Sequence, residues 1–390
     1  MKHNWEYKRL GDVCKIVNGF AFKSELFKDS GMPILRIANI QNDTITTDAL
    51  VFCNPSDYKT DLSKFLVKSD DLVMALSGAT TGKIGINKTN IEFYLNQRVA
   101  LFKDILISRR YLFYFLKTEG KNILESAFGV AQPNVSTSKL TELYIPVPTQ
   151  NVQERIVAEL DKINETIEDC RELLRNLDAL AQSLFYDFFG DPNINPKGWE
   201  MRKFAEVCDT FTDGDWIESK DQSTDGFRLI QTGNIGEGIY LDKSERSKFI
   251  SADTFYSLKC KEVFEGDILI SRLPDPIGRA CILPKLPLRS ITAVDCTIVR
   301  PKSFILPNFL LQYTLTDAYY NSLSSITKGA TRKRVSRGNL GKVLIPVPPI
   351  SLQEQFAARI EQIEVQKKAV EQTIAELQTL LDSRMDYYFG

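Results

Sequence analysis

At 390 residues the chain is too long for one ordinary hydrophobic core, and we expect two or three domains. Its 43% hydrophobic and 25% charged residues are typical of a globular protein, and no apolar run approaches the roughly 18–20 residues that span a bilayer. The 49 basic and 50 acidic residues nearly cancel, and the single histidine, His3, argues against histidine-based catalysis and His-rich metal sites.

The cysteines and the first residues indicate the cellular compartment. The seven cysteines are scattered without a Cys-x-x-Cys pair, so the sequence predicts neither a zinc site nor a disulfide framework. Residues 1–6 contain no apolar stretch that could serve as a secretion signal. We therefore expect reduced thiols in a cytoplasmic protein with no membrane partner.

In chain order, short apolar runs between Gly, Asn, Asp and Ser predict strands at 32–37 and 71–76, and a helical stretch begins at Tyr111. The segment Ile145-Pro146-Val147-Pro148 then denies helix, and Asn151 is a natural N-cap just beyond it. Glycines and prolines at 190–198 predict a linker. Beyond the linker the same plan returns, with a strand at 266–270 and Ser351 as the second N-cap.

The chain is an internal duplication. Ile145-Pro146-Val147-Pro148 recurs 200 residues later as Ile345-Pro346-Val347-Pro348, and Gln153-Glu154 recurs at Gln353-Glu354. Over 141–160 against 341–360, seven of twenty positions are identical without a gap. Near the start of each half the offset is 194, as for Trp5 and Trp199, so the second half carries a few insertions.

After each Pro-x-Pro segment an uninterrupted helix is expected, at 151–190 and at 351–390. Apolar residues in both are spaced alternately by four and three, which is a heptad seam. Lys367 interrupts the second seam, where it could set the register or extend into solvent. The predicted helix–helix seam consists of Ile156, Leu160, Ile163, Ile167, Leu174, Leu177, Phe356, Ile360, Ile363, Val370, Ile374 and Leu377.

A breaker-rich linker between the first helix and the second domain favours an antiparallel helix pair. The predicted fold class is therefore α/β (mixed α+β). Two similar globular domains are joined by two long antiparallel coiled-coil helices, with pseudo-two-fold symmetry. The expected boundaries are 1–150 and 191–350 for the domains and 151–190 and 351–390 for the helices.

Charge is divided unevenly between these parts. The segment 151–190 holds 9 acidic and 4 basic residues and the segment 351–390 holds 7 and 4. Together they carry a net charge of −8, which leaves +7 on the remaining residues. Acidic helices would be repelled by DNA, whereas mildly basic globular domains would attract it.

Candidate DNA contacts fall into three groups. A basic run before the second Pro-x-Pro segment suits phosphate contact, although a solvated loop is an equal alternative. In the first half, Ser77–Lys83 is a Gly/Thr/Lys loop that does not match the NTPase phosphate-loop pattern. Three further arginines could meet a guanine, a phosphate or a carboxylate. The candidates are Ser77, Thr80, Thr81, Lys83, Arg98, Arg272, Arg279, Lys328, Arg332, Lys333, Arg334 and Arg337.

No reaction centre is evident. Asp57-Tyr58-Lys59 is a nuclease half-motif without its upstream partner, and no methyltransferase motif or glycine-rich cofactor turn is present. We expect no catalytic residue and no resident metal. Two alternatives stay open, a coiled-coil scaffold that does not bind DNA and a metal-dependent nuclease with a cryptic carboxylate site.

The duplicated domains with Ile-Pro-Val-Pro, Gln-Glu and a heptad helix resemble the specificity (S) subunit of type I restriction-modification enzymes. Residues 78–85, 96–100 and 132–135 are similar to recurring family segments, whereas 275–279 and 331–335 replace two of them in the second half. The resemblance covers essentially the whole chain.

The resemblance implies that 1–150 and 191–350 are target-recognition domains, each reading one half of a bipartite, asymmetric double-stranded DNA target. The helices would set the spacing and dock two methyltransferase subunits. Residues 156–184 would span about 43 Å, slightly more than one DNA turn of about 34–36 Å. The chain would be non-catalytic and bind no cofactor. S-adenosylmethionine would serve the methyltransferases, and ATP and Mg the restriction (translocase/nuclease) subunits.

Overall fold

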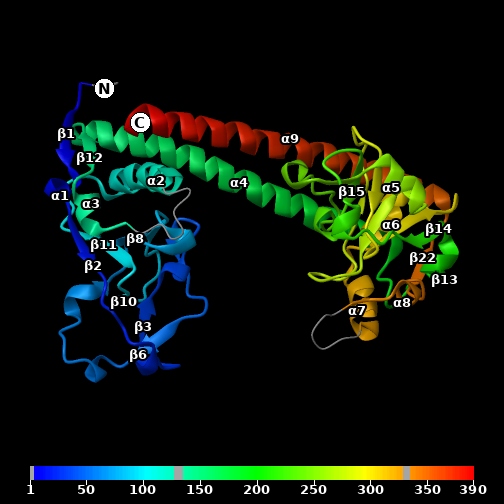
Figure 1. Ribbon diagram of the computed structural model, residues 1–390, viewed down its shortest axis with the longest axis horizontal. Coiled ribbons are helices and arrows are strands. Elements are labelled where there is room, and N and C mark those ends of the chain that lie inside the picture. The colour runs from blue at the N-terminus through cyan, green and yellow to red at the C-terminus, as the bar shows by residue number, and fades with distance from the viewer. Residues whose placement is uncertain (1–3, 127–134, 328–333) are drawn as a thin grey trace. The chain divides into compact units, whose positions relative to one another are not determined.

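The computed structural model describes residues 4–126, 135–327 and 334–390 (Figure 1). The chain divides into two compact units, the first formed by Met1–Cys170 with Thr373–Gly390 and the second by Arg171–Gln372. Each unit therefore contains a globular domain together with part of both long helices.

The described residues of the first unit form three sheets. Strand β1 (Glu6–Arg9) pairs antiparallel with β12 (Tyr144–Val147). A six-stranded sheet has the order β2 (Lys15–Asn18), β11 (Val99–Lys103), β8 (Leu72–Ala75), β9 (Ile84–Ile86), β5 (Thr44–Ile45) and β4 (Ile40–Gln41). A four-stranded sheet has the order β6 (Val51–Cys53), β3 (Met32–Leu35), β10 (Phe93–Leu95) and β7 (Leu66–Val67).

Strand β8 shows why a continuous apolar run forms this core. Successive side chains on a strand point to opposite faces, so a strand covered on both faces needs apolar residues throughout. Leu72 and Met74 pack in the cluster that includes the long helices, and Val73 and Ala75 pack in the cluster on the other face. Helices α1 (Leu10–Val13), α2 (Arg109–Ser126) and α3 (Thr137–Thr141) complete the domain.

The second unit repeats this plan. Strand β13 (Glu200–Lys203) pairs antiparallel with β22 (Leu344–Val347). One four-stranded sheet has the order β14 (Cys208–Asp213), β21 (Cys296–Pro301), β18 (Ile268–Ser271) and β19 (Ala280–Ile282). The other has the order β16 (Lys248–Ile250), β15 (Phe227–Ile230), β20 (Ser290–Thr292) and β17 (Glu262–Val263).

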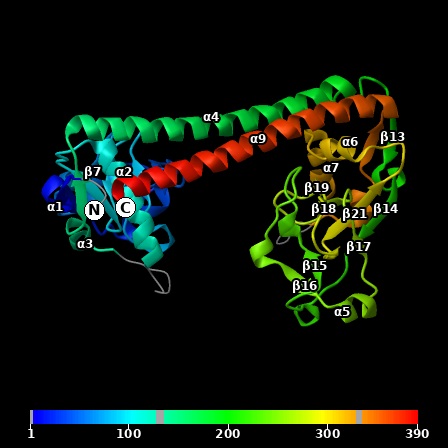
Figure 2. The same ribbon diagram turned by 90° about the horizontal axis from the view of Figure 1, so that it is seen from above.

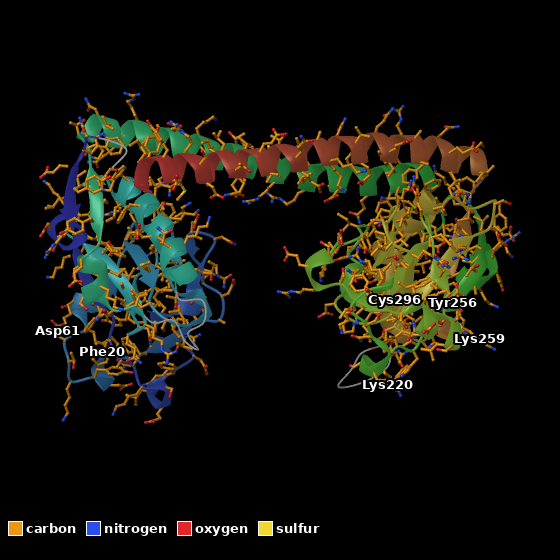
Figure 3. All side chains as sticks on the ribbon, turned by 45° about the horizontal axis from the view of Figure 1, so that its top comes forward. Phe20, Asp61, Lys220, Tyr256, Lys259 and Cys296 are labelled. Atoms are coloured by element: carbon orange, nitrogen blue, oxygen red, sulfur yellow. The ribbon has the colours of Figure 1, made fainter. Side chains whose placement is uncertain are left out.

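The helices differ between the units. In place of the 18-residue α2, the second unit has α6 (Pro307–Tyr313) and α7 (Asp317–Ile326), separated where the Thr316 side chain accepts from the Tyr319 N–H and caps α7. The remaining helices are α5 (Ala252–Ser257) and α8 (Arg337–Leu340). Figure 3 shows Phe20 and Asp61 far from the long helices within the first unit, and Lys220 and Lys259 likewise within the second.

The last proline of each Pro-x-Pro segment and the glutamine of each Gln-Glu pair form a buried hydrogen-bonded contact, which we call the clip. The Gln153 amide donates to the Pro148 carbonyl at 2.9 Å and its oxygen accepts from the Ser108 N–H at 2.9 Å. In the second unit Gln353 donates to the Pro348 carbonyl at 2.8 Å and accepts from the Leu306 N–H at 2.8 Å. Each glutamine thus joins the start of a long helix to the segment before α2 or α6.

Helices α4 (Gln150–Phe189) and α9 (Ile350–Phe389) are 40 residues each. The predicted N-caps are wrong by two residues, because the carbonyls of Thr149 and Pro349 already accept the first helical N–H groups and place Asn151 and Ser351 inside the first turn. Along both helices the seam positions are buried or half-buried, and most residues between them are exposed.

In each unit the two helices run antiparallel and lie side by side (Figure 1, Figure 2). In the first unit Glu159 of α4 accepts from Arg384 of α9. In the second, Asp178 of α4 pairs with Lys367 of α9 at 2.8 Å, so the seam lysine has an ionic partner. The mixed α/β class with two similar domains and two long antiparallel helices is confirmed.

Candidate nucleic-acid interface

The Gly/Thr/Lys loop of the first unit connects β8 to β9. Gly82 has φ +83, and a Cβ there would lie 2.4 Å from the Gly120 carbonyl oxygen, so only glycine allows the loop to approach α2. Thr81 is buried and donates to the Gly78 carbonyl at 2.7 Å. The hydroxyls of Ser77 and Thr80 are buried without a hydrogen-bond partner in the described ranges, and Lys83 is exposed.

Backbone hydrogen bonds bring the other first-unit candidate to this loop. The Leu76 N–H donates to the Arg98 carbonyl at 2.9 Å, and the Val135 N–H donates to the Leu76 carbonyl at 2.8 Å. The side chain of Arg98 is exposed. Exposed Lys83 and Arg98 therefore lie on segments that meet at this junction, and both side-chain types can contact phosphate or base edges.

The second unit builds the same junction with other residues. The Arg272 N–H donates to the Asp295 carbonyl at 2.9 Å, and the Val335 N–H donates to the Arg272 carbonyl at 3.3 Å. Arg272 is only 2% exposed, and its guanidinium donates to the carbonyls of Val335 and Val294. Burial lowers the pKa of Arg272, as does nearby Arg334, and the carboxylate of Asp213 at 3.3 Å opposes this shift.

The guanidinium of Arg279 also uses its hydrogen-bond donors within the protein. Its guanidinium donates to four backbone carbonyls, at 2.6–3.1 Å, and thereby joins two loops; the acceptors are Ile235, Leu273, Pro276 and Thr232. For direct contact with DNA, Arg272 would have to leave its buried site and Arg279 would have to give up these bonds. We therefore expect both to position loops.

Two second-unit candidates remain accessible. Arg334 and Arg337 have side chains 46% exposed, and each lies near a carboxylate, Asp295 at 3.0 Å and Asp213 at 4.0 Å respectively. Lys328, Arg332 and Lys333 lie outside the described residues. Sequence reasoning missed both aspartates, because the match of Asp295 to Arg98 appears only in the backbone hydrogen bonds of the folded units.

Metal ligands and thiols are the other groups that could carry chemistry in the described part of the chain. There, no three His, Cys, Asp or Glu side chains gather where they could hold a metal ion. All seven cysteines are free, and six are buried, as the sequence predicted for most of them. Burial raises the pKa of Cys14, Cys208 and Cys281 to about 12. Within the described ranges no helix combines the length and apolarity needed to cross a membrane.

The fold defines a class of protein, with two diverged mixed α/β domains that share a pair of long antiparallel helices and carry different polar loops at equivalent junctions. The chain belongs to the family of type I restriction-modification specificity subunits. The model of the type I restriction modification DNA specificity domain matches residues 2–176 and 196–379.

Several curated relatives share parts or nearly all of the chain. The EcoAI specificity subunit of Escherichia coli is 30% identical over 204 residues, which are 50% of this chain and 34% of that protein. The MjaVIII specificity subunit of Methanocaldococcus jannaschii is 33% identical over 173 residues, 42% of this chain and 40% of that protein. The chain thus matches less than half the length of these two. The EcoBI specificity subunit of E. coli is 21% identical across 95% of this chain and 81% of its own.

Two solved structures share the fold. A chain from work on complex assembly and conformational transition of the type I R-M system has a TM-score of 0.60 at 20% identity, covering 99% of this chain and 97% of its own. The S subunit of a type I restriction-modification system from M. genitalium has a TM-score of 0.50 at 16% identity, covering 99% and 96%.

Proposed function

We propose that this chain is a non-catalytic DNA-recognition subunit in which each unit reads one half of a bipartite, asymmetric double-stranded target. The observation that carries the proposal is the junction present in both units with different side chains. One junction holds Lys83 and Arg98 and the other holds Arg334 and Arg337. Equivalent positions on related backbones with unlike polar groups suit two unlike half-sites.

The helix pair has two roles in this proposal. It fixes the gap between half-sites, and its acidic surface faces two methyltransferase subunits rather than DNA. Restriction subunits join the same assembly in the cytoplasm. S-adenosylmethionine, ATP and Mg belong to those partners, and this chain binds no cofactor of its own.

A salt series on the full-length chain tests the proposal. Binding to a labelled pool of randomised 40-base-pair duplexes should weaken linearly in log Kd against log salt, because phosphate contacts release counterions. Lys83→Ala with Arg98→Ala should flatten the slope by about two. The matched control Lys88→Ala changes an exposed lysine of the same unit outside this junction and should leave more of the slope intact.

Two outcomes would overturn the proposal. No duplex binding at any salt concentration, with or without a methyltransferase partner, would favour the scaffold alternative. Cutting of the duplex by the purified chain with Mg²⁺, lost on Asp57→Ala, would favour the nuclease alternative. Asp57 pairs with Lys28 at 2.9 Å, so Lys28→Ala controls for loss of that ion pair.

A further inference from the structure

The junction of the second unit contains a cluster of five charged side chains. Buried Arg272 lies 3.3 Å from Asp213, Arg334 lies 3.0 Å from Asp295, and Arg337 lies 4.0 Å from Asp213. Asp213 also accepts from the Thr297 hydroxyl at 3.2 Å. The side chains of the two carboxylates are 26% and 29% exposed, more than that of Arg272 at 3% and less than those of Arg334 and Arg337 at 46%.

The fold does not require this cluster. In the first unit Leu76 takes the place of Arg272 and forms the same two backbone hydrogen bonds, and it is 4% exposed. The carbonyl that accepts from the Leu76 N–H belongs to Arg98, so Arg98 takes the place of Asp295. An apolar side chain therefore completes the same junction, and the charged version is a property of the second unit alone.

Neither stability nor simple attraction accounts for the cluster. Removing a guanidinium from water is costly, and its partners at best offset that cost, whereas an apolar residue of similar size avoids it. Two carboxylates beside Arg334 and Arg337 also weaken the attraction of this surface for a polyanion. What the carboxylates supply is geometry, since each can hold an accessible guanidinium from one side.

We propose that Asp213 and Asp295 are positioning residues that hold Arg334 and Arg337 in place for sequence-specific DNA contact by the second unit. This proposal rests on the proposed function. A guanidinium has five N–H donors, so an arginine held by one carboxylate keeps donors for a phosphate or a guanine. Side chains already ordered before binding lose less conformational entropy when DNA arrives.

Arg272 anchors the cluster. It holds the Val335 carbonyl, and Val335 is fully buried between the two accessible arginines in sequence. Ser336 then caps α8 by accepting from the Asn339 N–H at 3.2 Å, which fixes the backbone at Arg337. The backbone of both arginines is therefore set by buried contacts, and the aspartates set the direction of their side chains.

The direction in which DNA affinity changes when Asp213 and Asp295 lose their charge tests the proposal. The full-length chain carrying Asp213→Asn and Asp295→Asn has two fewer negative charges beside the DNA-facing arginines. Charge alone predicts tighter binding to every duplex. Positioning predicts that binding to a duplex selected by the wild-type chain weakens at least tenfold relative to an unselected 40-base-pair duplex, while binding to the unselected duplex stays equal or tightens.

A charge-matched control separates position from net charge. Asp209→Asn with Asp225→Asn removes two exposed carboxylates of the same unit and should leave the ratio of selected to unselected affinity unchanged. If the double Asn variant loses its cooperative thermal transition, adding Arg272→Leu copies the first-unit residue and removes the buried charge. This triple variant should fold and show the same loss of selectivity.

Three results would decide between the claims. An unchanged affinity ratio in the folded variant would overturn the positioning role. Equal tightening toward both duplexes would assign the aspartates to charge balance and overturn it as well. A wild-type chain that selects no duplex would contradict the proposed function itself, and the two failures are thereby distinguished.

Discussion

Arg384, near the end of α9, donates to both carboxylate oxygens of Glu159 in α4, and Tyr388 donates to the same carboxylate at 2.7 Å. The bond from Arg384, with that from Tyr388, lowers the pKa of Glu159 against the opposing effect of burial. This polar contact has no counterpart in the second unit, where Leu184 and Phe188 hold the equivalent positions.

Glu159→Gln should lower the stability of the first unit by about 1 kcal/mol at pH 7, since the ion pair is partly exposed. A carboxylate with a lowered pKa in the folded state contributes stability above its unfolded pKa of about 4.3 and loses it as the pH falls through the folded value. Thermal melts of both proteins should therefore converge in acid. A difference in melting temperature that persists or grows at low pH would contradict a stabilising role of the ion pair.

The Gln153 clip should be worth more, because its loss leaves buried backbone groups without partners. Gln153→Ala should lower the free energy of unfolding by about 2 kcal/mol in urea denaturation. Gln353→Ala should cost a similar amount in the second unit, and exposed Gln150→Ala, which loses only a contact to Glu154, should cost little. Equal small effects for all three would argue against a structural role for the clip.

Gly82 should tolerate no side chain. Gly82→Ala combines a positive φ with a Cβ 2.4 Å from a backbone oxygen, and should destabilise the first unit by more than about 2 kcal/mol. Gly266 has φ +88 but open space around its Cβ position, so Gly266→Ala measures the backbone strain alone, about 1 kcal/mol. If the two variants melt at the same temperature, the close approach to α2 is not what selects glycine.

The helix pair should act as a spacer. Repeating one heptad of the seam in both α4 and α9 adds about 10 Å to each helix, or about three base pairs of DNA. The gap between selected half-sites should lengthen accordingly, with both half-sites unchanged. A target of unaltered spacing, bound by a protein with an intact melting transition, would contradict the spacer role.

The helices were predictable because their signal is local. The spacing of apolar residues by four and three is enough to locate the seam. Lys367 is the exception, because its place on the seam is explained only by its ion pair with Asp178 on the other helix. The helix starts differ by one residue since Thr149 and Pro349 supply the first acceptors, a role that any backbone carbonyl can fill.

The candidate interface was harder to predict because the sequence does not show whether a charged side chain is buried or exposed. Arg98 and Arg272 are the same residue type, yet the side chain of Arg98 is exposed, whereas that of Arg272 is buried and donates to the carbonyls of Val294 and Val335. Only the register of the strands shows that Arg272 matches Leu76 and that Asp295 matches Arg98. Side-chain roles that depend on distant backbone acceptors leave no pattern in one sequence.

The sequences of DNA retained by the full-length chain test the central claim most directly. Selection from a randomised duplex library, followed by sequencing, should return two unlike blocks separated by a gap of unread base pairs. Arg334→Ala with Arg337→Ala should blur one block, and Lys83→Ala with Arg98→Ala the other. A single continuous block, two identical blocks, or no enrichment at all would contradict the account.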